Sequence, residues 1–158
     1  MHMRVIGIDP GYGRCGVAVL ESARPREILV YSSCIETPAR APFPERLAAI
    51  SGECERLMRE HSPEALAMER LYFNSNQKTA MQVAEVRGAI LASAARVGIP
   101  SFEYTPAAVK AAVSGYGRAN KRAVASMLAA LLAIEKEIRH DDEYDAIAVG
   151  VAHLAIAR

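Results

Sequence analysis

The sequence has no tryptophan, only three cysteines and a formal net charge of +1. The cysteines are odd in number and form no C-x-x-C pair, so they predict neither a disulfide framework nor a thiolate metal site. No apolar run approaches the roughly 18 residues that a membrane-spanning helix needs. The first strand-like run starts at Arg4 and contains Asp9, which is not the pattern of a secretory leader. We therefore expect a cytoplasmic protein without a membrane partner.

The chain does have enough apolar residues to build one core. Of its 158 residues, 51% are apolar and 23% are charged, and a domain of this length buries about 68–70% of its unfolded surface. This composition excludes disordered, collagen-like and disulfide-stapled classes. Since neither an internal repeat nor a linker interrupts the sequence, we expect a single domain over residues 1–158.

Charge is distributed unevenly along the chain. Between Arg70 and Arg122, eight basic residues stand against two acidic ones, whereas six acids stand against two bases in Glu135–Asp145. A basic middle segment beside an acidic flank favours a polyanionic partner and a separate carboxylate cluster. Solvated helix faces of mixed sign would give the same counts, so both interpretations stay open on charge alone.

Hydrophobic patterning predicts strands followed by alternating helices and strands. Three β-branched runs with short separations indicate an antiparallel meander, and two later apolar runs indicate buried strands. We expect strands at 4–9, 16–20, 28–35, 65–69 and 101–104, and helices at 42–60, 77–96, from 105–106 onward, 120–134 and 142–157. This order is typical of an α/β ribonuclease H-like fold. The expected sheet is five-stranded and mixed, three antiparallel strands then two parallel, with helices on both faces.

Two acidic residues end segments that should be buried strands. Asp9 ends the first strand and Glu69 ends the fourth. If these strands are parallel neighbours, both carboxylates emerge at the sheet edge where α/β proteins bind ligands. Two neighbouring carboxylates repel each other unless a cation neutralises them, and Mg²⁺ prefers such hard oxygen ligands. The sequence therefore predicts a Mg²⁺ site at this edge.

A further acidic group begins the last expected helix. Asp142 and Asp145 are three residues apart and so share a helix face. Asp141 lies on the same face, and spacing does not choose between it and Asp142 as a metal ligand. Each acid taken singly has an ordinary interpretation as a turn former, an ion-pair partner or a helix N-terminal acid. In this order, however, the four acids are the set that a two-metal nuclease requires.

An ordered set of motifs resembles the RuvC-type Holliday junction resolvases. The motifs extend from Met3 to about Ala155 and comprise Gly7-Ile8-Asp9-Pro10-Gly11 with Gly16, Met68-Glu69 followed by Tyr72-Phe73 and Asn74, Val86-Arg87-Gly88, Val109-Lys110, Lys121, and Asp142-x-x-Asp145-Ala146-x-Ala148. The resemblance implies a homodimeric, Mg²⁺-dependent endodeoxyribonuclease (crossover junction endodeoxyribonuclease). Such an enzyme resolves four-way DNA junctions by paired symmetric nicks in homologous recombination and DNA repair. A branch-migration translocase is the further partner that the family implies.

The resemblance also assigns roles to individual residues. It implies a metal-binding catalytic set of Asp9, Glu69, Asp142 and Asp145, with Lys121 as a further catalytic residue. Two Mg²⁺ ions per active site are implied, with Mn²⁺ as a substitute. The expected DNA-binding residues are Tyr72, Phe73, Lys78, Arg87, Lys110, Arg118, Lys121 and Arg122. Because family members usually carry phenylalanine where this chain has Tyr72, the resemblance does not tell which of the two aromatic rings stacks at the junction.

Other functions remain open from the residues alone. The main alternative is another ribonuclease H-like, metal-dependent nuclease that acts on non-junction nucleic acid. A sugar-kinase or actin-like ATPase would need a second phosphate loop, for which 158 residues leave no room. A non-catalytic binding module would have no need for all four acids. The apolar face of the helix at 77–96 is the expected dimer interface.

Overall fold

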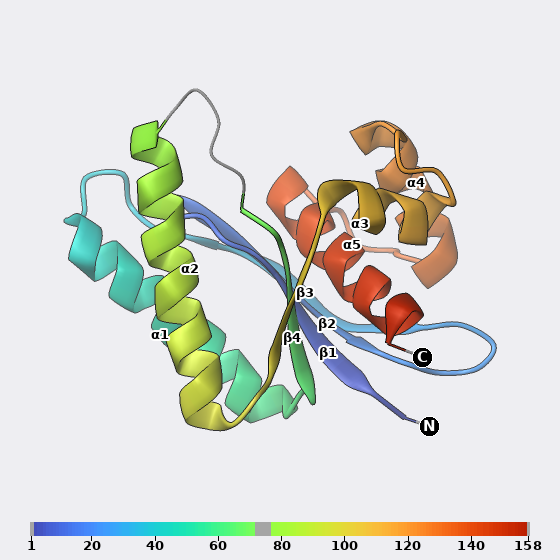
Figure 1. Ribbon diagram of the computed structural model, residues 1–158, viewed down its shortest axis with the longest axis horizontal. Coiled ribbons are helices and arrows are strands. Elements are labelled where there is room, and N and C mark those ends of the chain that lie inside the picture. The colour runs from blue at the N-terminus through green and yellow to red at the C-terminus, as the bar shows by residue number, and fades with distance from the viewer. Residues whose placement is uncertain (1, 72–76, 158) are drawn as a thin grey trace.

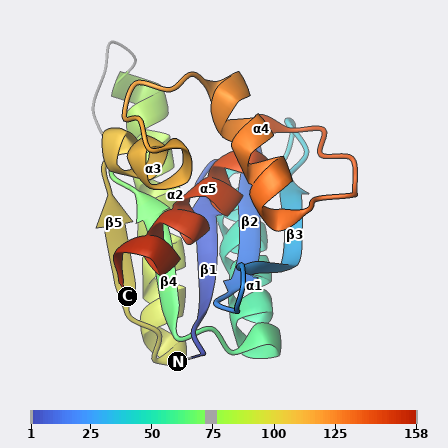
Figure 2. The same ribbon diagram turned by 90° about the vertical axis from the view of Figure 1, so that its right-hand side faces the viewer.

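The computed structural model describes residues 2–71 and 77–157, and its centre is a five-stranded sheet with helices on both faces (Figures 1 and 2). The strands are β1 (Arg4–Asp9), β2 (Arg14–Glu21), β3 (Ile28–Glu36), β4 (Ala65–Glu69) and β5 (Ser101–Tyr104). The helices are α1 (Phe43–His61), α2 (Gln77–Val97), α3 (Pro106–Ser114), α4 (Lys121–Leu132) and α5 (Asp141–Ile156). Among these residues no helix is both long and apolar enough to cross a membrane.

The strands lie in the order β3-β2-β1-β4-β5. The pairs β1–β2 and β2–β3 are antiparallel, whereas β1–β4 and β4–β5 are parallel. The expected mixed sheet, with its antiparallel meander and two added parallel strands, is therefore confirmed. Since β1 lies in the middle, its last residue is the most central strand end in the molecule.

Side chains of β1 alternate between two apolar layers. Ile6 and Ile8 pack with α1 and α2 on one face, whereas Val5 packs with α5 on the other. Figure 1 shows this division, with α1 and α2 on one side of the sheet and α3, α4 and α5 on the opposite side. By the same alternation, Gly7 and Asp9 lie on the face that α5 covers.

Helix α5 lies unusually close to the sheet because two strand positions carry no side chain. A Cβ added at Gly7 would lie 2.2 Å from the carbonyl oxygen of Ala146, and one added at Gly16 would lie 1.8 Å from that of Asp142. Any larger residue would push the helix away. The start of α5 is thus seated directly on β2, and Gly16 is the register partner of Asp9.

Helix ends follow local signals with small departures from the expected bounds. Thr105 caps α3 by accepting a hydrogen bond from the Ala108 amide at 3.1 Å, and Asn120 caps α4 in the same way. Helix α4 ends at Leu132, two residues earlier than expected, because Ala133 adopts a left-handed conformation with φ of 49°. Strand β2 starts at Arg14 rather than at Gly16, since its pairing with β3 extends that far.

Candidate active site

The ends of β1 and β4 bring two acids together. The parallel register pairs Ile8 with Met68, so Asp9 and Glu69 follow side by side at the carboxyl ends of neighbouring strands. Alternation places both acids on the face covered by α5. The expectation that these strands are parallel neighbours is confirmed.

Asp9 lies in the electrostatic field of the other three acids. The pKa of its carboxyl is raised from 3.8 to about 8, mainly by burial and then by the negative charges of Asp145, Asp142 and Glu69, in that order. Lys121 acts in the opposite direction. Four acids that are far apart in the sequence therefore share one site.

The pKa values of Glu69 and Asp145 are raised as well. Burial is the largest cause that raises the pKa of each carboxyl, and the charge of Asp145 also raises the pKa of Glu69. The Nζ atom of Lys121 lies 3.4 Å from Oδ2 of Asp145, and this ion pair raises the pKa of the lysine. Lys110 joins Lys121 in partly offsetting the shift at Glu69.

The structure distinguishes Asp142 from Asp141. The side chain of Asp141 is 80% exposed and lies 4.0 Å from Lys121, whereas that of Asp142 is 25% exposed and pairs with Arg14 at 3.1 Å. Only Asp142 of these two contributes to the shift at Asp9. The geometry therefore favours Asp142 as the member of the acidic set, a choice that spacing left open.

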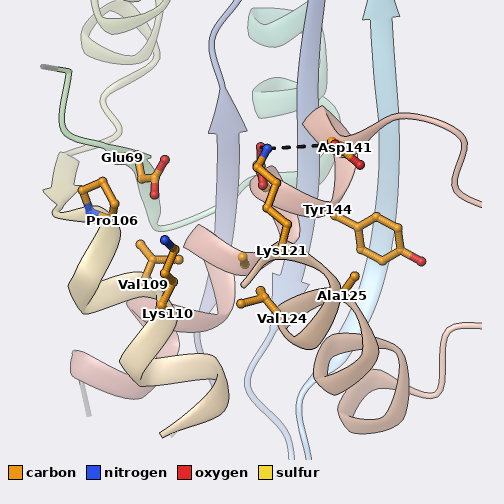
Figure 3. Close-up of a pocket in the computed structure, with 11 residues that line it drawn as sticks. Glu69, Pro106, Val109, Lys110, Lys121, Val124, Ala125, Asp141 and Tyr144 are labelled. Carbon is orange, nitrogen blue, oxygen red and sulfur yellow. Dashed lines mark hydrogen bonds and ion pairs between the residues drawn. The ribbon is translucent and has the colours of Figure 1, made fainter. Parts of the chain in front are cut away.

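A cavity of about 250 Å³ opens beside these acids, between α3, α4 and α5 (Figure 3). Figure 3 shows Glu69 and Lys110 on one side of it and Lys121 reaching toward Asp141 on the other. Asp145 also lines it, and its remaining lining is largely apolar: Pro106, Val109, Val124, Ala125, Tyr144 and Ala148. The cavity therefore places two lysines beside acidic side chains on an otherwise apolar wall.

The acids have the chemistry of a divalent-cation site. Four carboxylates offer the hard oxygen ligands that Mg²⁺ prefers, and the negative charges of the other three acids add to burial in raising the pKa of Asp9. In residues 2–71 and 77–157, no three His, Cys, Asp or Glu side chains are grouped so that they could hold a metal ion as they stand. Arg14 and Lys121 instead pair with Asp142 and Asp145. The four carboxylates are thus chemically suited to Mg²⁺, but their side chains are not arranged to coordinate it in this structure.

The candidate DNA-binding residues divide into three groups. Lys110 and Lys121 line the cavity. Lys78, Arg118 and Arg122 are exposed, as a contact with a phosphate backbone requires. Tyr72 and Phe73 fall outside the residues that the structure describes.

Arg87 requires a correction, because it is buried rather than available to DNA. Its side chain is 8% exposed and forms an ion pair with Glu103. Its Nη1 atom also donates to the backbone carbonyl oxygen of Glu69 at 2.7 Å. Arg87 therefore holds the end of β4 from behind. The helical spacing of α2 could have predicted this burial, because Arg87 lies one turn from the buried Ile90 on the covered side of the helix.

Two charged residues near the site were missed by the sequence analysis. Arg14 precedes Gly16 by two residues, so alternation along β2 directs both toward α5. Glu143 lies between the two acids of α5 and is only 6% exposed. It accepts a hydrogen bond from Oγ of Ser32 at 2.6 Å and pairs with Lys136 at 2.5 Å. No periodicity identifies the contacts of Glu143 with Ser32 or of Arg14 with Asp142, since these partners are distant in sequence.

Comparison with known proteins finds relatives that match almost the whole chain. The family model described as "Crossover junction endodeoxyribonuclease RuvC" matches residues 5–153. The chain is 46% identical to the protein of that name from Moorella thermoacetica over 156 residues, which cover 98% of this chain and 93% of the relative. It is 42% identical over 151 residues to the one from Desulfitobacterium hafniense, with 96% and 92% coverage. Its fold is similar to that of T. thermophilus RuvC, solved in complex with a Holliday junction substrate. The TM-score is 0.93 and the identity 31%, over 99% of this chain and 95% of that one.

Proposed function

This chain belongs to the RuvC family of crossover junction endodeoxyribonucleases, and from that premise we propose that it cuts Holliday junctions with the acids around Asp9. It is a divalent-metal-dependent hydrolase that resolves four-way DNA junctions in recombination and repair. The observation that carries the assignment of the site is the position of Asp9, which ends the central strand within the field of three other carboxylates.

We assign the metal-binding role to Asp9, Glu69, Asp142 and Asp145, and we propose Mg²⁺ as the metal, two ions per site, with Mn²⁺ as a substitute. When bound, such ions supply an activated water and neutralise charge on the scissile phosphate and the leaving 3′ oxygen. Asp9 is half-buried at the end of β1, and this burial is the largest cause of its raised pKa. Neutralisation there would remove the repulsion that now raises the pKa of Asp9.

We propose that two lysines hold the phosphate. Lys110 and Lys121 line the same cavity from α3 and α4, and both lower the pKa of Glu69 through their charge. Cations fixed beside a reacting phosphate stabilise the charge that develops in the transition state. We propose that Lys121 is catalytic and that Lys110 orients the phosphate.

Further DNA contacts are proposed beyond the two cavity lysines. We propose that Lys78, Arg118 and Arg122 bind phosphates without reading sequence. An aromatic ring from Tyr72 or Phe73, which follow β4 closely, would stack on an unpaired base at the junction centre, a contact worth about 1–3 kcal/mol. If so, Tyr72→Ala or Phe73→Ala will impair junction resolution more than the binding of duplex DNA.

We further propose that residues 1–158 form one nuclease domain that works as a cytoplasmic homodimer with a branch-migration translocase. Symmetric nicking needs two sites, and each chain supplies one acidic set. The α2 helix is the candidate interface, because it exposes Met81 to 60% on a helix that otherwise packs on α1. A purely monomeric protein in solution would count against symmetric nicking.

The direct experiment is to incubate the protein with a synthetic four-way junction, with and without Mg²⁺, and to map the nicks on all four strands. We expect Mg²⁺-dependent nicks at symmetric positions in two strands of like polarity. Nicked, flapped, RNA-containing and intact duplexes serve as competitors. Preferred cleavage of any of these over the junction would favour the alternative, a ribonuclease H-like nuclease with a non-junction substrate.

A further inference from the structure

We propose that Glu143, Lys136 and Ser32 form a polar clamp that positions the first turn of α5 and with it the two metal-binding acids of that helix. This inference rests on the proposed function, because it concerns how the same site is held. None of the three residues is an expected metal ligand or DNA contact. Glu143 and Ser32 are therefore positioning residues that act through Asp142 and Asp145. Lys136 supplies the positive charge that balances Glu143.

The clamp joins three segments at one point. Oγ of Ser32 on β3 donates to Oε1 of Glu143 at 2.6 Å, and Nζ of Lys136 lies 2.5 Å from the same oxygen. The same Nζ donates to the backbone carbonyl oxygen of Ser32 at 2.7 Å. Strand β3, the segment between α4 and α5, and the first turn of α5 are thereby tied together.

The geometry of an α-helix explains why this tie fixes the acids. Successive residues are about 100° apart around the helix, so Glu143 faces away from the side that Asp142 and Asp145 share. Any rotation of the first turn that moved those acids away from Asp9 would also pull Glu143 from its partners. On the underside, the carbonyl of Asp142 is already seated against Gly16, where no side chain fits. The turn is held from two directions.

Burial of charge at this point argues for a role beyond stability. Among the residues that the structure describes, the Asp, Glu, Lys and Arg side chains that are buried are those of Arg87 and Glu143. Each is attached to a segment that carries a candidate ligand: Arg87 to the backbone of Glu69, and Glu143 to the turn of Asp142. In each pair only one charge is buried, since Glu103 is 41% and Lys136 is 47% exposed. Desolvation of the buried charge offsets much of the attraction, so such a pair is a poor way to stabilise a fold. The presence of a buried charge beside both Glu69 and Asp142 is explained if these charges fix the positions of the two acids.

The test uses the full chain carrying Glu143→Gln, which preserves shape and the hydrogen bond from Ser32 but removes the charge. Mn²⁺ binding without DNA is measured by electron paramagnetic resonance. We expect the half-saturating concentration to rise by about tenfold, the usual effect of losing a partner that orients metal ligands. The Mg²⁺ concentration for half-maximal junction cleavage should rise by a similar factor, while cleavage at saturating Mg²⁺ approaches the wild-type rate.

A matched control and a second variant keep the test decisive. Glu21→Gln removes a carboxylate that pairs with Arg4 at 2.6 Å at the other end of β2, far from the site, and should leave Mn²⁺ binding unchanged. Lys136→Met removes the other half of the clamp at a side chain that is 47% exposed, so folding should survive. It should weaken Mn²⁺ binding like Glu143→Gln. The double variant should weaken binding by less than the sum of the two single effects, because the two residues act through one contact.

The proposal is wrong if Glu143→Gln and Lys136→Met lower the melting temperature like Glu21→Gln but bind Mn²⁺ as the wild type does. If Glu143→Gln does not fold, the result for Lys136→Met decides. Failure of the proposed function is distinct, since it would appear as a wild-type protein that binds Mn²⁺ but leaves junctions intact.

Discussion

The two ends of β1 carry opposite electrostatic arrangements. At the first end, Arg4 pairs with Glu21, with Nη2 2.6 Å from Oε2, and also donates to the backbone carbonyl of His61 at 2.7 Å. At the last end, Asp9 is half-buried in the field of three other acids, and its pKa rises to about 8. One strand therefore carries a satisfied ion pair at one end and an unbalanced carboxylate at the other.

This difference separates what stabilises the fold from what serves the reaction. The Arg4–Glu21 pair satisfies its charges within the chain and leaves nothing for a ligand. The crowded acids are unfavourable in the metal-free protein, and a bound cation would relieve that repulsion. Perturbed titration inside a cleft is typical of functional sites, so the end of β1 that costs stability is the one expected to carry out chemistry.

The largest effect should come from removing the charge at the acidic end. Asp9→Asn keeps the size of the side chain but loses a proposed metal ligand, so we expect junction cleavage to fall by about 10³-fold, while junction binding is retained. Single-turnover cleavage and a gel-shift titration measure the two quantities. Glu21→Gln, at the paired end, should cleave as the wild type does, and equal losses in both variants would remove the contrast.

Removing the cationic side chain at either end of β1 should have a smaller effect than Asp9→Asn. Lys121→Ala should lower cleavage at saturating DNA by about 10²-fold, because Lys121 is fixed beside Asp145 and the cavity. Arg4→Ala should lower the melting temperature without changing that rate. A Lys121→Ala enzyme that cleaves normally at saturating DNA would contradict the catalytic role of this lysine.

The acidic end should also make the stability of the metal-free protein depend on pH. Between about pH 4 and pH 8, native Asp9 retains a proton that the unfolded chain has released, so the free energy of unfolding falls as pH rises. The raised pKa values of Glu69 and Asp145 act in the same direction. The fall due to Asp9 is at most about 1.4 kcal/mol per pH unit, and urea denaturation in EDTA at several pH values measures it.

The control for this dependence is Asp9→Asn, which should be more stable than the wild type at pH 8 without metal and should show a shallower slope. His153, whose pKa is lowered by burial, contributes an opposite slope below pH 6.5, but equally in both proteins. Added Mg²⁺ should stabilise the wild type more at pH 8 than at pH 6. Parallel profiles for the two proteins would show that Asp9 does not titrate as described.

The smallest effect concerns Arg14, which pairs with Asp142 through a side chain that is 54% exposed. Exposed pairs contribute about 0.2–1 kcal/mol. Because Arg14 competes with a cation for Asp142, Arg14→Gln should lower the half-maximal Mg²⁺ concentration by less than about fivefold. A rise in this concentration would mean that Arg14 assists the metal site instead.

Much of the fold followed from local patterns. Every expected strand and helix is present, because β-branched runs bounded by turns and apolar residues at helical spacing specify elements within a few residues. The positions of Asp9 and Glu69 at strand ends were visible for the same reason. What the patterns did not reveal was burial that depends on distant partners: Arg87 was expected on the surface and lies under β4, paired with Glu103.

The order of residues along the chain was sufficient to say which elements form and which acids stand at their ends, because both depend on neighbours a few positions apart. It was not sufficient to choose Asp142 over Asp141, to bury Arg87 or to join Glu143 to Ser32, which lies 111 residues away. Those outcomes follow from the placement of β1 between β2 and β4 and from the close seating of α5 on Gly7 and Gly16. Contacts between distant segments are set by the packing of whole elements, for which local periodicity carries no signal.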